Sequence, residues 1–138
     1  MVDPEAVERR LREIDRRIAA ARRLRDKGRE RFFAEPDLQT LAEHHLQVAI
    51  QSAIDIAVHI LAEDFPETPE DYASAFRSLG RVGVVEEGLA DRLASAAGLR
   101  NVIVHLYMDV DMERVWSSLE DLGQLQEYAE SIRTYLSR

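Results

Sequence analysis

The sequence predicts an all-α protein, a four-helix up-and-down bundle with one additional short helix. Apolar residues recur every three or four positions over long stretches, which is the periodicity of a helix that buries one face. No segment shows the alternation of a β-strand. The 138 residues, 46% of them apolar and 32% charged, suffice for one core, so we expect a single domain over residues 1–138.

The first helix is predicted to begin near Pro4, with Asp3 as its N-cap, and to end near Gly28. An aspartate can accept hydrogen bonds from the free amides of the first turn, and proline fits the first helical position because its missing N–H is not needed there. The apolar stripe of this helix consists of Val7, Leu11, Ile14, Ile18 and Ala21.

The second helix is predicted from about Pro36 to Ala62. It is apolar on two faces. One face holds Leu38, Leu41, Ala42, Ala49, Ala53, Ile56 and Ile60, and the other holds Leu46, Ile50, Ile54, Ala57 and Leu61. A helix that is apolar around most of its circumference is buried on more than one side. We therefore expect a central helix, or one that also faces a second subunit.

Residues 65–69 are predicted to form a linker that leads into a short helix. Thr68 is the expected N-cap, Pro69 the first helical residue and Gly80 the end. The third long helix should start near Glu86, and Gly98 should interrupt or kink it.

The last helix is predicted over about residues 112–136, with Asp111 as its cap. Its inward positions are Val115, Leu119, Leu122, Ala129, Ile132 and Leu136.

Composition limits the possible environments and functions. The absence of cysteine excludes disulfides, thiolate metal sites and a cysteine nucleophile, and fits a reducing cytoplasm. Neither a secretory signal nor an uncharged apolar run of the ~18 residues of a membrane span is present. The net charge of −8 is not that of an obvious nucleic-acid binder, and we expect no binding of DNA.

Charge is unevenly distributed along the chain. Residues 1–31 hold 11 of the 18 basic and 7 of the 26 acidic residues and so carry +4, whereas the remaining 7 basic and 19 acidic residues carry −12. The basic first helix could attract RNA or an acidic partner. The alternative is a solvated face neutralised by ion pairs one turn apart, such as Glu5–Arg9, Glu8–Arg12 and Glu13–Arg17.

A polar stripe runs along the second helix at every fourth position. It consists of Glu43, Gln47, Gln51, Asp55 and His59. These side chains either hydrogen-bond to one another and to water, or line a cleft beside the segment of residues 100–107. Asp55 is the candidate supporting residue, because a carboxylate can orient an arginine or a histidine.

The four histidines do not form a recognisable metal motif. Di-metal sites in helical bundles use Glu-x-x-His, and no histidine here has a glutamate three positions before it. An HExxH motif is also absent. We therefore predict no metal and no cofactor.

Residues 100–107 read Arg-Asn-Val-Ile-Val-His-Leu-Tyr and place four polar groups among aliphatic ones. On a helix, Asn101 and His105 share a face, and Arg100 and Tyr107 lie close to it. Arginine is a permanent cation and histidine exchanges protons near neutral pH, so the pair suits phosphate chemistry. From spacing alone, an arginine paired with a carboxylate and a histidine satisfied in the core remain the alternative.

The same segment resembles the RX4HXY signature of HepT-like toxins, which belong to the HEPN superfamily and act in HEPN–MNT toxin–antitoxin pairs. Arg100, Asn101, His105 and Tyr107 match it position by position. Residues 53–57, 72–76 and 109–111 are also similar to that family, so the resemblance extends over roughly residues 5–136.

The resemblance implies a HEPN-like bundle that forms a homodimer and acts as a metal-independent endoribonuclease. His105 would be the general acid/base and Arg100 would stabilise the phosphate charge. Asn101 would position one of them or the RNA. The products would carry a 2′,3′-cyclic phosphate and a 5′-hydroxyl. An MNT-type nucleotidyltransferase antitoxin would be the partner, and Tyr107 the residue to which it adds AMP. The alternative is a non-catalytic HEPN-like module that binds a nucleotidyltransferase or a nucleotide.

Overall fold

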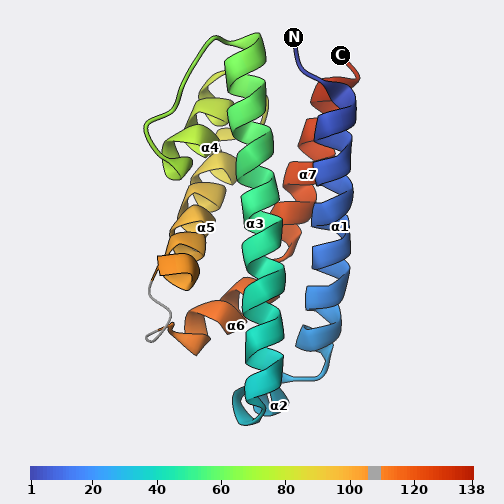
Figure 1. The fold of residues 1–138 in the computed structure, drawn as a ribbon, viewed down its shortest axis with the longest axis vertical. Coiled ribbons are helices and arrows are strands. Elements are labelled where there is room, and N and C mark those ends of the chain that lie inside the picture. The colour runs from blue at the N-terminus through green and yellow to red at the C-terminus, as the bar shows by residue number, and fades with distance from the viewer. Residues whose placement is uncertain (106–109) are drawn as a thin grey trace.

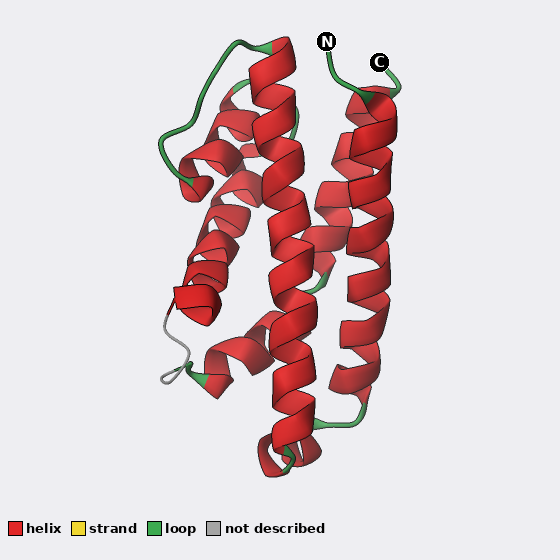
Figure 2. Cartoon of the chain, in the orientation of Figure 1, coloured by secondary structure: helices red, strands yellow, loops and turns green. Residues whose placement is uncertain are grey.

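The computed structural model describes the backbone of residues 1–105 and 110–138 and the side chains of residues 1–100 and 110–138. These parts form seven helices and no strand, which confirms the all-α class (Figure 1, Figure 2). The helices are α1 (Pro4–Asp26), α2 (Arg29–Ala34), α3 (Pro36–Asp64), α4 (Tyr72–Arg81), α5 (Glu87–His105), α6 (Met112–Glu120) and α7 (Gly123–Leu136).

The starts of the two longest helices follow the predicted local signals. The carboxylate of Asp3 accepts hydrogen bonds from the amides of Glu5 and Ala6 at 3.0 and 3.3 Å, and α1 begins with Pro4. Helix α3 begins with Pro36. Both signals act within one helical turn, so they operate before any tertiary contact forms.

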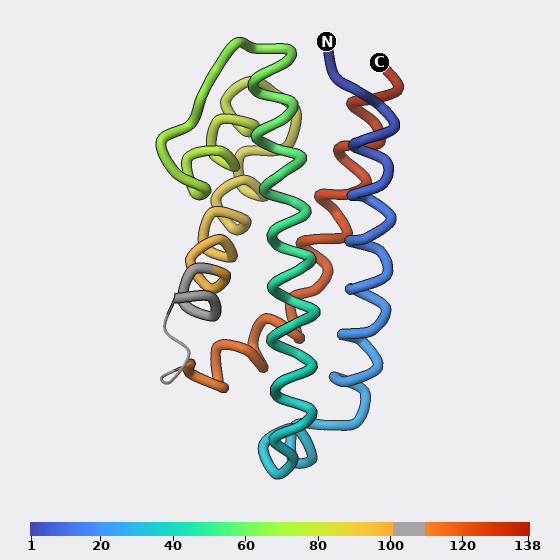
Figure 3. Tube along the Cα trace, viewed as in Figure 1, coloured from blue at the N-terminus to red at the C-terminus, as the bar shows by residue number. Residues whose placement is uncertain are grey.

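Helix α3 lies at the centre of the fold, between α1 and α7 on one side and α4 and α5 on the other (Figure 1). The two chain ends lie at the same end of the molecule (Figure 3). Twelve residues of α3 are buried, and eleven of them, including Ile54, Ile56 and Ile60, join the common core formed with the surrounding helices. The central position predicted from its two apolar faces is confirmed.

Helix α3 is also long and apolar enough to cross a membrane by length and composition. Its most apolar 18-residue window has a mean hydropathy of 1.3, and 56% of that window is buried inside the fold. A core helix passes the same test, and here the other helices cover most of its apolar residues.

Helix α2 was not predicted from the sequence. Gly28 adopts a φ of +99°, which ends α1 and turns the chain into the six residues of α2. Phe32 of α2 is fully buried, and its ring centroid lies 5.3 Å from that of Trp116. This short helix therefore exists because tertiary packing retains Phe32, and it has too few residues for a visible periodicity.

The predicted last helix is two helices. Asp111 caps α6 as expected, because its carboxylate accepts from the amide of Glu113 at 2.9 Å. The helix then ends at Glu120, and α7 begins at Gly123. Glycine favours a helix less than other residues do, and the break here lets α6 cross beneath α5 while α7 runs beside α1 (Figure 1).

Two further boundary predictions were wrong. The short helix starts at Tyr72 with Asp71 as its N-cap, not at Thr68, because the Asp71 carboxylate accepts from the amide of Ser74 at 2.7 Å. Gly98 does not interrupt α5, which continues to His105. Gly98 is exposed and no neighbour lies within 4 Å of the position where a Cβ would stand. A single glycine costs a helix only about 1 kcal/mol, which packing of the rest of α5 offsets.

Candidate functional site

The predicted motif arginine, Arg100, lies near the end of α5 that faces the start of α4. Helices α4 and α5 form a tight hairpin because Gly80 has no side chain, and a Cβ there would lie only 2.8 Å from the Cβ of Ala90. This close packing brings Tyr72, the first residue of α4, beside Arg100. The guanidinium carbon lies 5.5 Å from the centroid of the Tyr72 ring, which is a cation–π contact.

Arg100 has no carboxylate within 4.0 Å among the side chains of residues 1–100 and 110–138. It is half-buried, and its Nε atom is buried without a hydrogen-bond partner in that part of the chain. Unpartnered buried polar atoms are uncommon and require an explanation. Within the described side chains, Arg100 is therefore a positioned cation and not the arginine–carboxylate pair that was the structural alternative.

The other motif residues are described less completely. Helix α5 is continuous to His105, so Asn101 and His105 lie one turn apart along it. Their side chains lie outside the described ones, and Tyr107 lies outside the described residues altogether.

Asp55 does not contact Arg100 within the chain. Its carboxylate lies 3.7 Å from Nε of Arg10 on α1 and accepts a hydrogen bond of 2.8 Å from Gln51. Asp55 occupies the side of α3 that packs beside α1, and Arg100 lies on α5 across α3 (Figure 1). Within one chain, Asp55 therefore contributes to the packing of α1 on α3. These contacts give no support to its predicted role of orienting a motif residue.

Asp55 and His59 of the polar stripe, and the adjacent His45, contact α1 or its N-cap. The Nε2 atom of His59 accepts a hydrogen bond of 3.1 Å from the amide of Asp3. Nδ1 of His45 lies 3.1 Å from the guanidinium of Arg17. Burial, and next the charge of Arg17, lower the pKa of His45, which favours the neutral ring that can accept from an arginine. No group of three or more metal-ligating side chains occurs in the parts of the chain where side chains are described.

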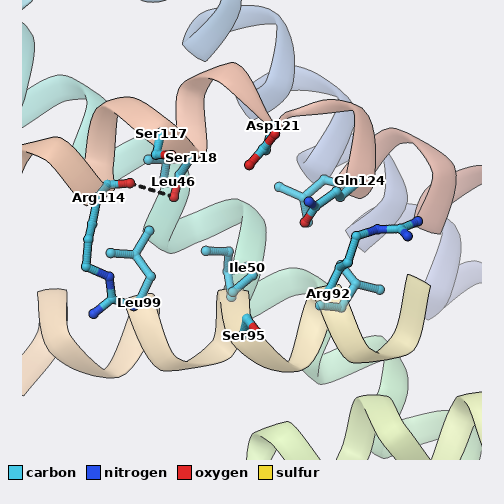
Figure 4. A pocket seen from close by; sticks show the side chains of 13 residues that line it. Leu46, Ile50, Arg92, Ser95, Leu99, Arg114, Ser117, Ser118, Asp121 and Gln124 are labelled. Carbon is cyan, nitrogen blue, oxygen red and sulfur yellow. Dashed lines mark hydrogen bonds between the residues drawn. The ribbon is translucent and has the colours of Figure 1, made fainter. Parts of the chain in front are cut away.

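A pocket of about 310 Å³ opens beside the motif-bearing half of α5 (Figure 4). Its floor is apolar and is formed by Leu46, Ile50, Leu93, Leu99 and Leu125. Its rim is polar and includes Arg92, Ser95, Arg114, Ser117, Ser118, Asp121 and Gln124. In Figure 4 the side chain of Arg114 reaches from α6 toward Leu99, and Arg92 stands at the other end. An apolar floor with a few polar groups around it is typical of a ligand site.

Residues 8–132 match the model of the family described as HepT-like, ribonuclease HepT-like. The chain belongs to this family. The resemblance inferred from residues 100–107 is thereby confirmed, and so is ribonuclease activity as the activity of the family. The pocket and Arg100 thus lie in a chain whose family cuts RNA.

Curated relatives agree with this assignment. Over 136 residues, which are 98% of this HepT-like chain and 92% of the relative, the chain is 30% identical to the tRNA nuclease HepT of Aphanizomenon flos-aquae. It is 31% identical over 97 residues to the mRNA nuclease HepT of Shewanella oneidensis, covering 67% of this chain and 73% of that one. The two relatives differ in their described substrate, which is tRNA for the first and mRNA for the second.

The fold is similar to that of a solved HEPN toxin from Shewanella oneidensis, described as tri-AMPylated and in complex with an MNT antitoxin. The TM-score is 0.86 at 24% identity, with 97% of this HepT-like chain and 99% of that chain covered. At this identity the likeness establishes the fold.

Sequence reasoning missed two parts of the site. Tyr72 lies near residue 100 only because the α4–α5 hairpin folds back, although residues 72–76 were among the segments that carry the family resemblance. The pocket combines residues of α3, α5, α6 and α7. Its rim has no common spacing in the sequence, so no pattern could have identified it.

Proposed function

We propose that this chain is the toxin of a type VII-like HEPN/MNT toxin–antitoxin pair and a metal-independent endoribonuclease of the cytoplasm. The observation that supports it most is Arg100, a half-buried cation that stacks on Tyr72 and has no carboxylate partner among the described side chains. A fixed positive charge of this kind suits the charge that develops on a phosphate during cleavage. Family membership supports RNA as the substrate class.

In the proposed reaction, His105 takes the proton of a ribose 2′-OH, and the 2′-oxygen forms a bond to the adjacent phosphorus. The bond from phosphorus to the 5′-oxygen then breaks, and this oxygen receives the proton from His105. The products are a 2′,3′-cyclic phosphate and a 5′-hydroxyl. Arg100 stabilises the negative phosphorane, and Asn101 positions the RNA or one of these two side chains. RNA supplies its own nucleophile, so these groups suffice.

The neighbouring pocket suits an adjoining nucleotide of the substrate. Its leucine and isoleucine floor offers an apolar surface to a base, and Arg92 and Arg114 are cations that suit a phosphate. Arg92 lies 3.4 Å from Glu127, whereas Arg114 has no carboxylate within 4.0 Å in the described part of the chain. Arg114 is therefore the rim residue that we expect to contribute more to binding.

The proposal is tested by incubating the purified chain with total RNA in excess EDTA. We expect endonucleolytic cleavage, with fragments that a 5′-kinase labels directly because they carry 5′-hydroxyl ends. A chain that binds a nucleotidyltransferase or a nucleotide but leaves RNA intact would support the non-catalytic module instead.

Tyr107 is the proposed site of regulation by an MNT-type nucleotidyltransferase antitoxin. With the antitoxin and ATP, we expect the intact mass to rise by whole AMP groups and RNA cleavage to stop, because each phosphate adds negative charge where RNA must bind. A Tyr107→Phe variant should keep its mass and its activity. The Tyr72→Phe variant is the matched control and should still be modified. Modification of Tyr107→Phe would contradict the assignment.

We also propose that the chain is a homodimer. Leu41 and Val58 on α3 are large apolar residues that are 46% and 37% exposed. The surrounding helices of this chain leave both side chains partly uncovered. Exposed apolar groups on an otherwise buried central helix fit an interface with a second copy.

A further inference from the structure

Five exposed cations lie along one face of α1 and its C-cap. We name them the basic row, and they are Arg9, Arg12, Arg16, Arg23 and Lys27. The steps between them are three, four, seven and four residues, which keep side chains on one side of a helix. At 1.5 Å per residue the row extends over about 27 Å.

Most of the basic row is not neutralised. Of the three ion pairs that the sequence suggested, only Glu13–Arg17 forms, at 2.8 Å, and Glu13 also pairs with Arg16 of the row. The pairs Glu5–Arg9 and Glu8–Arg12 are absent from the described part of the chain. In that part, the other four row residues have no carboxylate within 4.0 Å.

Three acidic residues beside the basic row are engaged by cations outside it. Arg133 of α7 lies 2.7 Å from Asp15 and 3.6 Å from Glu8. Asp26 pairs with Arg25 at 3.3 Å. Arg133 thus draws two carboxylates of α1 toward α7, and its charge offsets part of the negative charge beside the row.

We propose that the basic row is a docking surface for the phosphate backbone of RNA, separate from the cleavage motif. This inference rests on the proposed ribonuclease function and extends it. Arginine presents a planar fork of donors to phosphate oxygens, and four of the five row residues are arginines. Residues 32–138 carry −12, so RNA is repelled from most of the remaining surface and attracted to α1.

A protein partner fits the basic row less well. Protein interfaces have an apolar or aromatic centre. Along this face of α1, which is described in full, Ala19 is the exposed apolar residue and Ala20 is buried. A surface of spaced cations without large apolar groups matches a polyanion that is recognised by charge and not by base.

Helix α1, which bears the basic row, and helix α5, which bears Arg100, lie on opposite sides of α3 (Figure 1). Helix α1 makes no contact with α5 in the described part of the chain. A short oligonucleotide therefore cannot reach both places on one chain, whereas a folded RNA of tRNA size can. The row is thus expected to raise affinity for long substrates and to leave the chemistry of short ones unchanged.

The test compares two variants with the same change in net charge. The row variant is Arg9→Gln, Arg12→Gln, Arg23→Gln and Lys27→Gln. The control variant is Arg29→Gln, Arg31→Gln, Arg77→Gln and Arg81→Gln, whose arginines pair with Glu113, Glu35, Asp91 and Glu67. Glutamine preserves helix propensity, and both variants are checked by thermal unfolding.

Binding of labelled tRNA is measured in a His105→Ala background in EDTA, so that the result does not depend on cleavage. We expect the row variant to bind on the order of tenfold more weakly at about 50 mM salt. The slope of log affinity against log salt should fall by about 3, as four phosphate contacts predict. With His105 restored, cleavage of a short oligonucleotide should be unchanged.

Three outcomes would overturn the proposal. The row variant could bind tRNA as the parent does, or the two variants could lose the same affinity, which would indicate net charge alone. A row variant that keeps RNA binding but no longer holds an acidic protein partner would assign the surface to that partner. If the parent binds tRNA through the row but never cuts RNA, the proposed function fails and the docking surface stands.

Discussion

Replacing His105 with alanine is expected to lower the rate of RNA cleavage by about 10²- to 10⁴-fold, because the variant has no group to move the 2′-OH proton. Arg100→Gln should lower it by about 10²- to 10³-fold, since the developing phosphate charge loses its cation. The measurement is the initial rate on one RNA in EDTA. The cleavage rate of the double variant should be little lower than that of the less active single variant, because the two groups act in the same step.

Arg10→Gln is the matched control for Arg100→Gln. Arg10 is also an arginine of a long helix, and its partner Asp55 lies 3.7 Å away on α3. We expect its cleavage rate to stay within about twofold of the parent, because surface pairs contribute ~1 kcal/mol or less to stability. Equal cleavage by the parent and by His105→Ala would refute the proposed mechanism. A His105→Ala variant that unfolds would instead assign the histidine to the core.

Replacing Tyr128 with alanine is expected to destabilise the fold by about 3–5 kcal/mol, the range for losing a fully buried aromatic ring. Tyr128 is 0% exposed and lies edge-on to Phe76, with 5.7 Å between ring centroids. Its hydroxyl donates to the carbonyl oxygen of Ala53 at 2.8 Å. The residue thus joins α7 to both α3 and α4. Urea unfolding followed by circular dichroism measures the change.

Tyr128→Phe separates the ring from the hydroxyl. It keeps the packing and leaves the Ala53 carbonyl without its donor, so we expect a loss of about 1–3 kcal/mol. A surface tyrosine change, Tyr72→Phe, should leave stability nearly unchanged because Tyr72 is 36% exposed. If Tyr128→Phe were as unstable as Tyr128→Ala, the hydrogen bond rather than the ring would hold the helices together.

The starts of α1, α3 and α6 and the central position of α3 could be predicted because their signals lie within the helix or next to it. Asp3 caps the first turn of α1, which begins with Pro4, and Asp111 caps the first turn of α6. The two apolar faces of α3 require burial whatever surrounds them. Helix α2 could not be predicted, because it depends on the contact between the distant residues Phe32 and Trp116. The break at residues 121–122 could not be predicted either, because the glycine that follows it does not by itself end a helix, as Gly98 within α5 shows.

The motif residues of the candidate site were identified from the sequence because Arg100, Asn101, His105 and Tyr107 lie within eight positions. Sequence reasoning assigned Asp55 to the same site, and within one chain the fold places it against Arg10 instead. A helical period shows which residues share a face of one helix. It does not show which neighbouring helix that face meets. The position of α1 beside α3 gave Asp55 its partner Arg10 within the chain.

The sequence by itself determined that the chain is helical, where its longest helices begin, and that it carries the signature of a HepT-like ribonuclease. The tertiary structure decided which charges remain available. Arg100 stacks on Tyr72 because Gly80 lets α4 pack closely, and α1 keeps its basic row because Arg133 of α7 engages Glu8 and Asp15. Both results follow from contacts between helices distant in sequence, since an ion pair depends on distance in space.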